Sequence, residues 1–164
     1  MSKQIPFPPK KKMIACPPTT NSQLLALQYL LAALRGAHWS HWSSHWQVSG
    51  HPYYGDHLLM QRIYEAIPAE IDNLAEKIVA YYGPDAVAPL CQAAMMYQFL
   101  KFQEENDPIV RALNVERFLL EYFDSVFKEL DSQDKLSLGL NDYLAAAANA
   151  HETFVYLLQQ RTRS

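Results

Sequence analysis

Hydrophobic residues recur every three or four positions along most of the chain, which is the spacing of one face of an α-helix. The first such stripe consists of four leucines: Leu24, Leu27, Leu31 and Leu34. The polar residues 20–22 (TNS) precede it and offer helix N-caps. We predict a first long helix that starts there and ends at about Val48, before the turn-forming residues 49–52 (SGHP).

Start and stop signals divide the rest of the chain into four further helical stretches. Their predicted bounds are about 56–82, 86–104, 107 to 131–134 and 137–161, with Asp56 and Asp107 as candidate N-caps. No segment shows sustained strand alternation with hairpin turns. The pattern therefore predicts an all-α four-helix bundle, with a linker helix between the second and third long helices.

The first twenty residues differ from the rest, since they hold five of the ten prolines, four lysines and no acidic residue. Prolines at this density exclude a helix, so we predict an extended basic arm over 1–20 and one bundle domain over 21–164. The arm's lysines are candidate DNA contacts: Lys3, Lys10, Lys11 and Lys12. The alternative is that the arm docks on a protein surface through apolar residues such as Ile5 and Phe7.

Composition narrows the class of protein. A chain of 164 residues that is 49% hydrophobic can bury a single core, and a net charge of −3 excludes a generally basic nucleic-acid binder. No apolar run reaches the ~18 residues of a membrane span, and no secretory signal is evident. Cys16 and Cys91 lie 75 residues apart, so we expect one tail thiol and one packed thiol, which fits a reducing, cytoplasmic location.

The residues that could carry chemistry lie between positions 38 and 76. The leucine stripe continues as His38, His41 and His45, accompanied by Trp39, Trp42 and Trp46. Each imidazole can be a buried, hydrogen-bonded group at an interface, or a metal ligand. The second helix carries a polar line within one arc of about 100°: His57, Gln61, Glu65, Asp72 and Glu76. Such a face is either simply solvated or the donor set of a divalent metal.

Two segments of this region carry a family pattern. Residues 45–57 (HWQVSGHPYYGDH) and 72–78 (DNLAEKI) resemble Dps, the ferritin-like DNA-binding protein of starved cells. His-Trp occurs three times, but only His45 has the twelve-residue spacing to His57 that the family shows. The resemblance implies a ferritin-like fold, and it is weaker over the rest of the chain.

The resemblance implies a function and a site. Dps proteins are hollow dodecamers whose ferroxidase centre lies at a two-fold interface, so His45 and His57 would come from one subunit and Asp72 and Glu76 from its partner. Trp46 would lie next to the iron. The implied activity oxidises ferrous iron with peroxide, stores the ferric product and protects DNA, with a nucleoid association if DNA is bound.

Departures from the pattern leave two hypotheses open. The family has an aspartate where this chain has Gln61, although Glu65 could substitute, and Pro68 should kink the second helix. The protein is therefore either an active iron-oxidising mini-ferritin or a structural, DNA-compacting shell with an inactive metal site. A ferritin centre inside the bundle is disfavoured, because no Glu-x-x-His occurs. His38 and His41 could form an accessory metal site or proton relay, or pack at the dimer interface.

Overall fold

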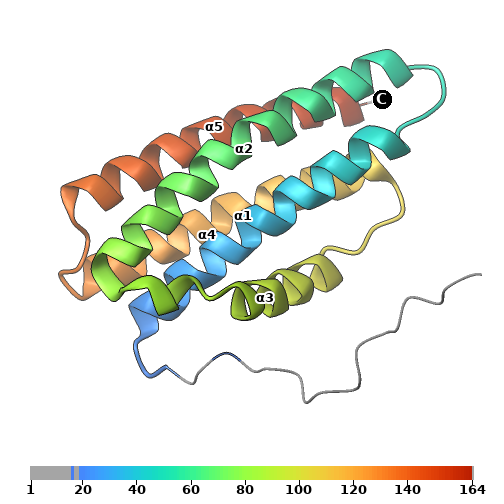
Figure 1. The fold of residues 1–164 in the computed structure, drawn as a ribbon. Helices are drawn as coiled ribbons and strands as arrows, with labels where there is room; N and C mark the ends of the chain where they lie inside the picture. Colours follow the sequence, from blue (N-terminus) through green and yellow to red (C-terminus); the bar gives the residue numbers. More distant parts are fainter. Residues whose placement is uncertain (1–15, 17–18, 164) are drawn as a thin grey trace, which may run out of the picture.

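Four long helices form an elongated bundle, and a shorter helix lies along one side of it (Figure 1). The computed structural model describes residues 16 and 19–163. The elements are α1 (Ser22–Gln47), α2 (Tyr53–Tyr82), η1 (Pro84–Val87), α3 (Pro89–Phe102), α4 (Pro108–Ser132) and α5 (Leu138–Thr162). The all-α bundle with a linker helix is confirmed. The division at residue 20 stays a prediction, because most of the arm lies outside the described residues.

Local hydrogen bonds explain where three of the long helices begin. Asn21 accepts from the backbone N–H of Leu24 at 2.9 Å. Asp107 accepts from the N–H groups of the first turn of α4, and Ser137 accepts from the first turn of α5. These side chains satisfy N–H groups that have no partner within their own helix.

The start of α2 corrects one prediction. Asp56 is not the N-cap, because α2 begins three residues earlier, at Tyr53. Gly50 has a φ of 84°, which lets the chain reverse so that the N–H of Tyr53 donates to the Gly50 carbonyl. Asp56 is buried and accepts two hydrogen bonds from Arg161, at 2.6 and 2.9 Å. It thus ties the start of α2 to the end of α5.

The core lies between the four long helices, and α1 is its most buried member. Residues on several sides of α1 are fully buried, because α2, α3 and α4 all pack against it. Each of the other long helices contributes one apolar stripe, typical of helices that face solvent on their outer side. Fully buried core residues include Leu27, Leu31, Leu34, Ile63, Ile67, Leu74, Leu119 and Leu158.

The linker helix α3 lies over the seam between α1 and α4. Phe99 packs against Gly36 of α1, and its ring centroid lies 5.5 Å from that of Phe118 on α4. Further along α3, Phe102 contacts the same Phe118 ring. Gly36 makes this close approach possible, since a Cβ at that position would lie 2.4 Å from Cδ1 of Phe99.

A disulfide contradicts the prediction of two separate thiols. Cys16 and Cys91 are bonded, with 4.8 Å between their Cα atoms. Their separation of 75 residues hid this proximity, because the packing of α3 on α1 brings Cys91 in the first turn of α3 beside Cys16, six residues before α1. The inference of a reducing compartment from unpaired cysteines therefore loses its basis.

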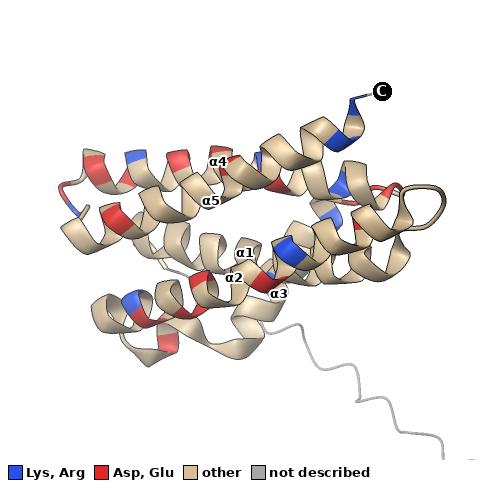
Figure 2. Ribbon diagram, turned by 90° about the horizontal axis from the view of Figure 1, so that it is seen from above, with Lys and Arg blue, Asp and Glu red and all other residues tan. Residues whose placement is uncertain are grey.

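Charged residues are spread over the outside of the bundle, with both signs present along the helices (Figure 2). Within the described residues, no helix combines the length and the apolar character that crossing a membrane requires. The four lysines that are clustered without acidic residues lie in residues 1–20, outside these helices.

The contact between α1 and α3 makes a stability prediction. Gly36→Ala should lower the free energy of unfolding by about 1–3 kcal/mol, because overpacking a filled core costs this much, although alanine is the better helix former. Denaturant unfolding followed by circular dichroism measures the change.

Gly55→Ala is the matched control, since Gly55 also lies in a helix and an added Cβ there meets nothing within 4 Å. That variant should be neutral or more stable by up to about 1 kcal/mol. Equal tolerance at the two positions would show that Phe99 is not packed against Gly36.

Candidate metal site

His45 and His57 form a stacked pair where α1 ends and α2 begins. Their ring centroids lie 3.6 Å apart. Nδ1 of His45 donates to the backbone carbonyl of His57 at 2.9 Å, and Nδ1 of His57 donates to the carbonyl of His45 at 3.0 Å. Since a carbonyl only accepts, both rings carry their proton on Nδ1 when neutral. Both Nε2 lone pairs are thereby available to a metal ion, and each ring is held in orientation.

Aromatic side chains surround this pair. The Tyr64 ring stands edge-on to His45, with 5.2 Å between centroids, and Tyr53 lies beside His57. Trp46 is 62% exposed and packs on Trp42, with 5.1 Å between the ring centroids. His45 is thus buried and His57 half-buried beneath aromatic rings, and the role assigned to Trp46 stays a prediction.

Gln61 and Glu65 occupy the next two turns of the same line on α2. The Gln61 amide donates to Oε1 of Glu65 at 2.7 Å. This bond occupies one carboxylate oxygen and leaves the Gln61 carbonyl oxygen as an acceptor. The two side chains thus form a linked unit one and two turns beyond His57.

Asp72 and Glu76 are exposed and lie far from the histidine pair. They follow His57 by 15 and 19 residues in one uninterrupted helix, which runs through Pro68. At about 1.5 Å per residue this separates them from His57 by roughly 22 and 28 Å. Within the part of the chain that is described, no three His, Cys, Asp or Glu side chains are arranged to hold one metal ion.

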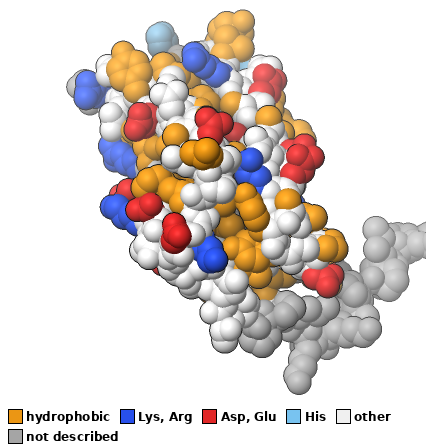
Figure 3. Space-filling view, turned by 90° about the vertical axis from the view of Figure 1, so that its left-hand side faces the viewer, with side chains coloured by type: hydrophobic (Ala, Val, Ile, Leu, Met, Phe, Trp, Pro, Cys, Tyr) orange, Lys and Arg blue, Asp and Glu red, His pale blue; other side chains and the backbone are white. Residues whose placement is uncertain are grey.

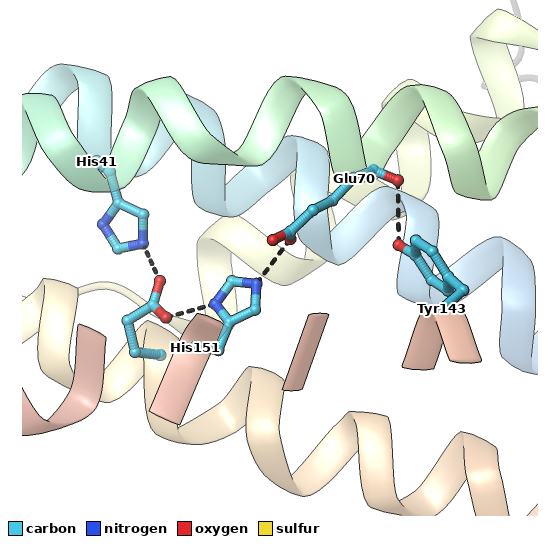
Figure 4. Close-up of polar contacts among 5 residues, drawn as sticks. His41, Glu70, Tyr143 and His151 are labelled. Carbon is cyan, nitrogen blue, oxygen red and sulfur yellow. Dashed lines mark hydrogen bonds and ion pairs between the residues drawn. The ribbon is translucent and has the colours of Figure 1, made fainter. Parts of the chain in front are cut away.

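A second polar cluster lies inside the bundle and joins all four long helices (Figure 4). Glu116 of α4 accepts from Nε2 of His41 at 2.7 Å and from Nδ1 of His151 at 2.5 Å. Nε2 of His151 lies 3.0 Å from a carboxylate oxygen of Glu70. The side chains of His41, Glu116 and His151 are fully buried. The network therefore links α1, α2, α4 and α5 through their interior.

Charge fixes the protonation of this network. Burial alone would raise the pKa of Glu116, but the charge and hydrogen bonds of the two histidines lower it to about 2. Burial would likewise lower the pKa of His151, and Glu116 and Glu70 raise it instead to about 10. His151 is thus an imidazolium that donates from both nitrogens. Among the described residues, Nδ1 of His41 is buried and has no hydrogen-bond partner.

The network corrects the expectations for His41. It does not pack at an exposed interface, because it is fully buried and hydrogen-bonded to Glu116. Its hydrogen bond goes to Glu116, whereas the His38 ring lies against Trp42 and Tyr64, so a joint metal site or proton relay of the two stays a prediction. The three histidines of the stripe therefore have three different environments. His41 lies in the core, His45 belongs to the stacked pair, and His38 contacts aromatic rings.

Sequence reasoning missed Glu70, Glu116 and His151 as members of this cluster. A signal existed for two of them, because Glu116 and His151 occupy the apolar stripes of their helices. Glu116 stands between Ala112 and Leu119, and His151 between Ala147 and Phe154. A charged or imidazole group at such a position requires an internal partner.

The DNA prediction is not tested by the structure. Lys3, Lys10, Lys11 and Lys12 all lie outside the described residues.

Comparison with solved structures identifies the fold. The chain superposes on Dps from Mycobacterium smegmatis, a C-terminal deletion mutant, with a TM-score of 0.72, 18% identity and coverage of 86% of this chain and 97% of that one. Dps from Listeria monocytogenes superposes with a TM-score of 0.70 at 18% identity, and the match covers 87% of this chain and 95% of that one. Dps from Vibrio cholerae O1 is described as a member of a superfamily of ferritin-like diiron-carboxylate proteins. It superposes with a TM-score of 0.70 at 17% identity, and the match covers 86% of this chain and 89% of that one.

No protein-family model matches the sequence, and no curated protein matches it. The structural likeness establishes a Dps-like, ferritin-like fold, as the resemblance of residues 45–78 predicted.

The buried network predicts how stability depends on pH. His151 has a raised pKa, so its contribution is complete below pH 6.5 and is lost as the pH rises toward about 10. Glu116 has a lowered pKa, so its contribution is present above pH 4.5 and is lost as the pH falls toward about 2. The free energy of unfolding should be greatest between these limits and fall above pH 7 by up to about 1.4 kcal/mol per pH unit. Urea unfolding from pH 3 to 9.5 measures it.

Glu116→Gln separates this network from other titrating groups. The variant removes the nearer of the two carboxylates that contact the buried His151 and leaves Glu70, which should cost about 3–5 kcal/mol and flatten the fall above pH 7. His51→Gln, at an exposed histidine outside the network, is the control and should keep the wild-type slope. An unchanged slope in Glu116→Gln would contradict the assignment of His151 as an imidazolium.

Proposed function

We propose that this protein oxidises ferrous iron with peroxide at a site shared between two copies of the chain, and stores the ferric product. The observation that carries the proposal is the His45–His57 pair. Each imidazole donates from Nδ1 to a main-chain carbonyl, which leaves Nε2 of both rings to bind a borderline divalent ion such as ferrous iron.

Two imidazoles alone do not complete an iron site. The carboxylates that the resemblance assigns to it, Asp72 and Glu76, lie about 20–30 Å away on the same helix. A second copy whose α2 runs antiparallel to the first would bring these carboxylates to His57. The midpoint between His57 and Glu76 falls near Ala66, so the two-fold axis would cross α2 there. The exposure of Asp72 and Glu76 leaves both side chains accessible to such a partner.

The proposed reaction uses iron as substrate. Two ferrous ions each lose one electron, peroxide accepts both, and with two protons it yields two water molecules. Because the O–O bond is cleaved by two electrons, no hydroxyl radical is released, and this protects DNA without requiring contact with it. Trp46, exposed beside His45 in the sequence, is proposed to lie next to the iron.

The second candidate is a structural shell with an inactive metal site. One observation favours it, which is the hydrogen bond from Gln61 to Glu65. An amide at this position brings no charge to a cation, and it engages Glu65, the carboxylate that could replace it. The two candidates differ in whether ferrous iron binds and turns over, not in the fold.

Anaerobic titration with ferrous iron, followed by peroxide and optical readout, tests the proposal. The wild type should oxidise iron rapidly, and His45→Ala and His57→Ala should each slow it by about tenfold or more, since each loses a ligand. Gln61→Asp should speed oxidation or tighten binding, because a carboxylate replaces a neutral amide.

His51→Ala removes an exposed histidine outside the pair and is the control. Kinetics in His45→Ala and His57→Ala that equal those of His51→Ala would place the iron chemistry elsewhere. No ferrous binding by the wild type, together with gain of activity in Gln61→Asp, would support the inactive shell.

Assembly is the second test. The shared site requires at least a dimer, and storage requires a closed shell, so light scattering should give a particle of about twelve subunits, as the resemblance implies. Substituting Trp46, which is exposed in the monomer, by aspartate should weaken assembly if this surface meets a partner, because apolar interface cores exclude charge. A wild-type protein that stays monomeric at all concentrations would contradict the shared site.

A further inference from the structure

An apolar groove runs along the surface between the start of α1 and the second half of α4. Its volume is about 440 Å³. Six of the residues that line it are Leu25, Ala26 and Tyr29 from α1 and Tyr122, Ser125 and Val126 from α4. The rings of Tyr29 and Tyr122 lie 6.4 Å apart, centroid to centroid, at one end. On the side of the molecule shown in Figure 3, hydrophobic side chains are exposed in patches among charged ones.

The groove continues the seam that α3 covers. From Met95 to Phe102, α3 lies over the seam, and Phe99 and Phe102 reach Phe118 on α4. One turn further along α4, the Phe118 ring stacks on Tyr122, which lines the groove. Among the described residues, the surface between α1 and α4 beyond the start of α3 is therefore apolar and open.

The disulfide brings the N-terminal segment to this place. Cys16 is bonded to Cys91 in the first turn of α3, and it packs in a small cluster that contains Tyr29. Tyr29 is also a wall of the groove. Cys16 is thus fixed beside the end of the groove that Tyr29 lines, next to the start of α3.

We propose that residues 5–9 (IPFPP) of the same chain dock in this groove. Proline-rich segments adopt an extended helix with little loss of entropy, and aromatic-lined grooves bind them. The groove follows α1 from Ser22 to Tyr29, which is about 10 Å. Phe7 lies nine positions before Cys16, a span of up to about 30 Å, so the segment reaches every part of the groove.

Charge supports the same occupant. Glu129 lines the groove, and Glu121 is exposed one turn before Ser125 on the same flank of α4. Residues 10–12 are three consecutive lysines directly after the apolar segment. Docking of residues 5–9 would place these lysines near the acidic flank, where attraction between exposed charges assists the apolar contact and weakens with salt.

Limited trypsin digestion of the full-length protein tests the docking, with mass spectrometry at the bonds after Lys10, Lys11 and Lys12. A docked arm is cut only when it is released, so the rate follows the released fraction. Phe7→Ser removes the anchor, and Ser125→Trp fills the groove from an exposed position. Each should raise the cleavage rate by about tenfold, as expected if the wild-type arm is docked about nine-tenths of the time.

Thr153→Trp, at an exposed position on α5 outside the groove, is the control and should leave the rate unchanged. Hydrogen exchange gives an independent measure, since Phe7→Ser should lower protection in residues 22–29 and 122–129 only. Equal cleavage of wild type, Phe7→Ser and Ser125→Trp would overturn the proposal, as would protection that appears only with duplex DNA. Protection that falls on dilution would assign the groove to the arm of another copy and overturn the intrachain form.

Discussion

The carboxylate of Glu116 is the group on which the arrangement of the four long helices most depends. A fully buried charge is tolerated only with close partners, and here the partners come from α1 and α5, with α2 joined through His151 and Glu70. Apolar contacts are not directional, so they tolerate a range of rotations of a helix about its own axis. A directional network with one donor or acceptor from each helix selects one of them.

That selection also sets the position of the histidine pair. His41 and His45 are one turn apart on α1, so the bond that turns His41 toward Glu116 also fixes the direction of His45. Gly50 then reverses the chain, and the first turn of α2 lays His57 on His45. The orientation of α1 that the core network selects thus also orients the candidate metal site, although the two sites have no residue in common.

Much of the fold could be predicted from the sequence, because it depends on local signals. The leucine stripe, the Asp107 cap and the end predicted for the second helix at about residue 82 all lie within a few residues of the observed helix bounds. The candidate pair His45 and His57 rested on a spacing of twelve residues, and the structure brings the two together. The Asp56–Arg161 pair, the Glu116 network and the disulfide escaped because each joins distant residues. Periodicity within a helix indicates which face is buried, but not which residues of the other helices contact that face.

The covalent bond between Cys16 and Cys91 also divides the chain topologically. It closes a loop that contains α1, α2 and η1, while α4 and α5 lie outside it. In the unfolded chain this loop removes conformational freedom worth about 4.5 kcal/mol for a closure of this length. In the oxidised unfolded chain, the segments of α1 and α2 are therefore confined within one loop, whereas those of α4 and α5 are not. The redox state of the surroundings thus sets how much of the bundle's stability derives from the restricted unfolded chain rather than from packing.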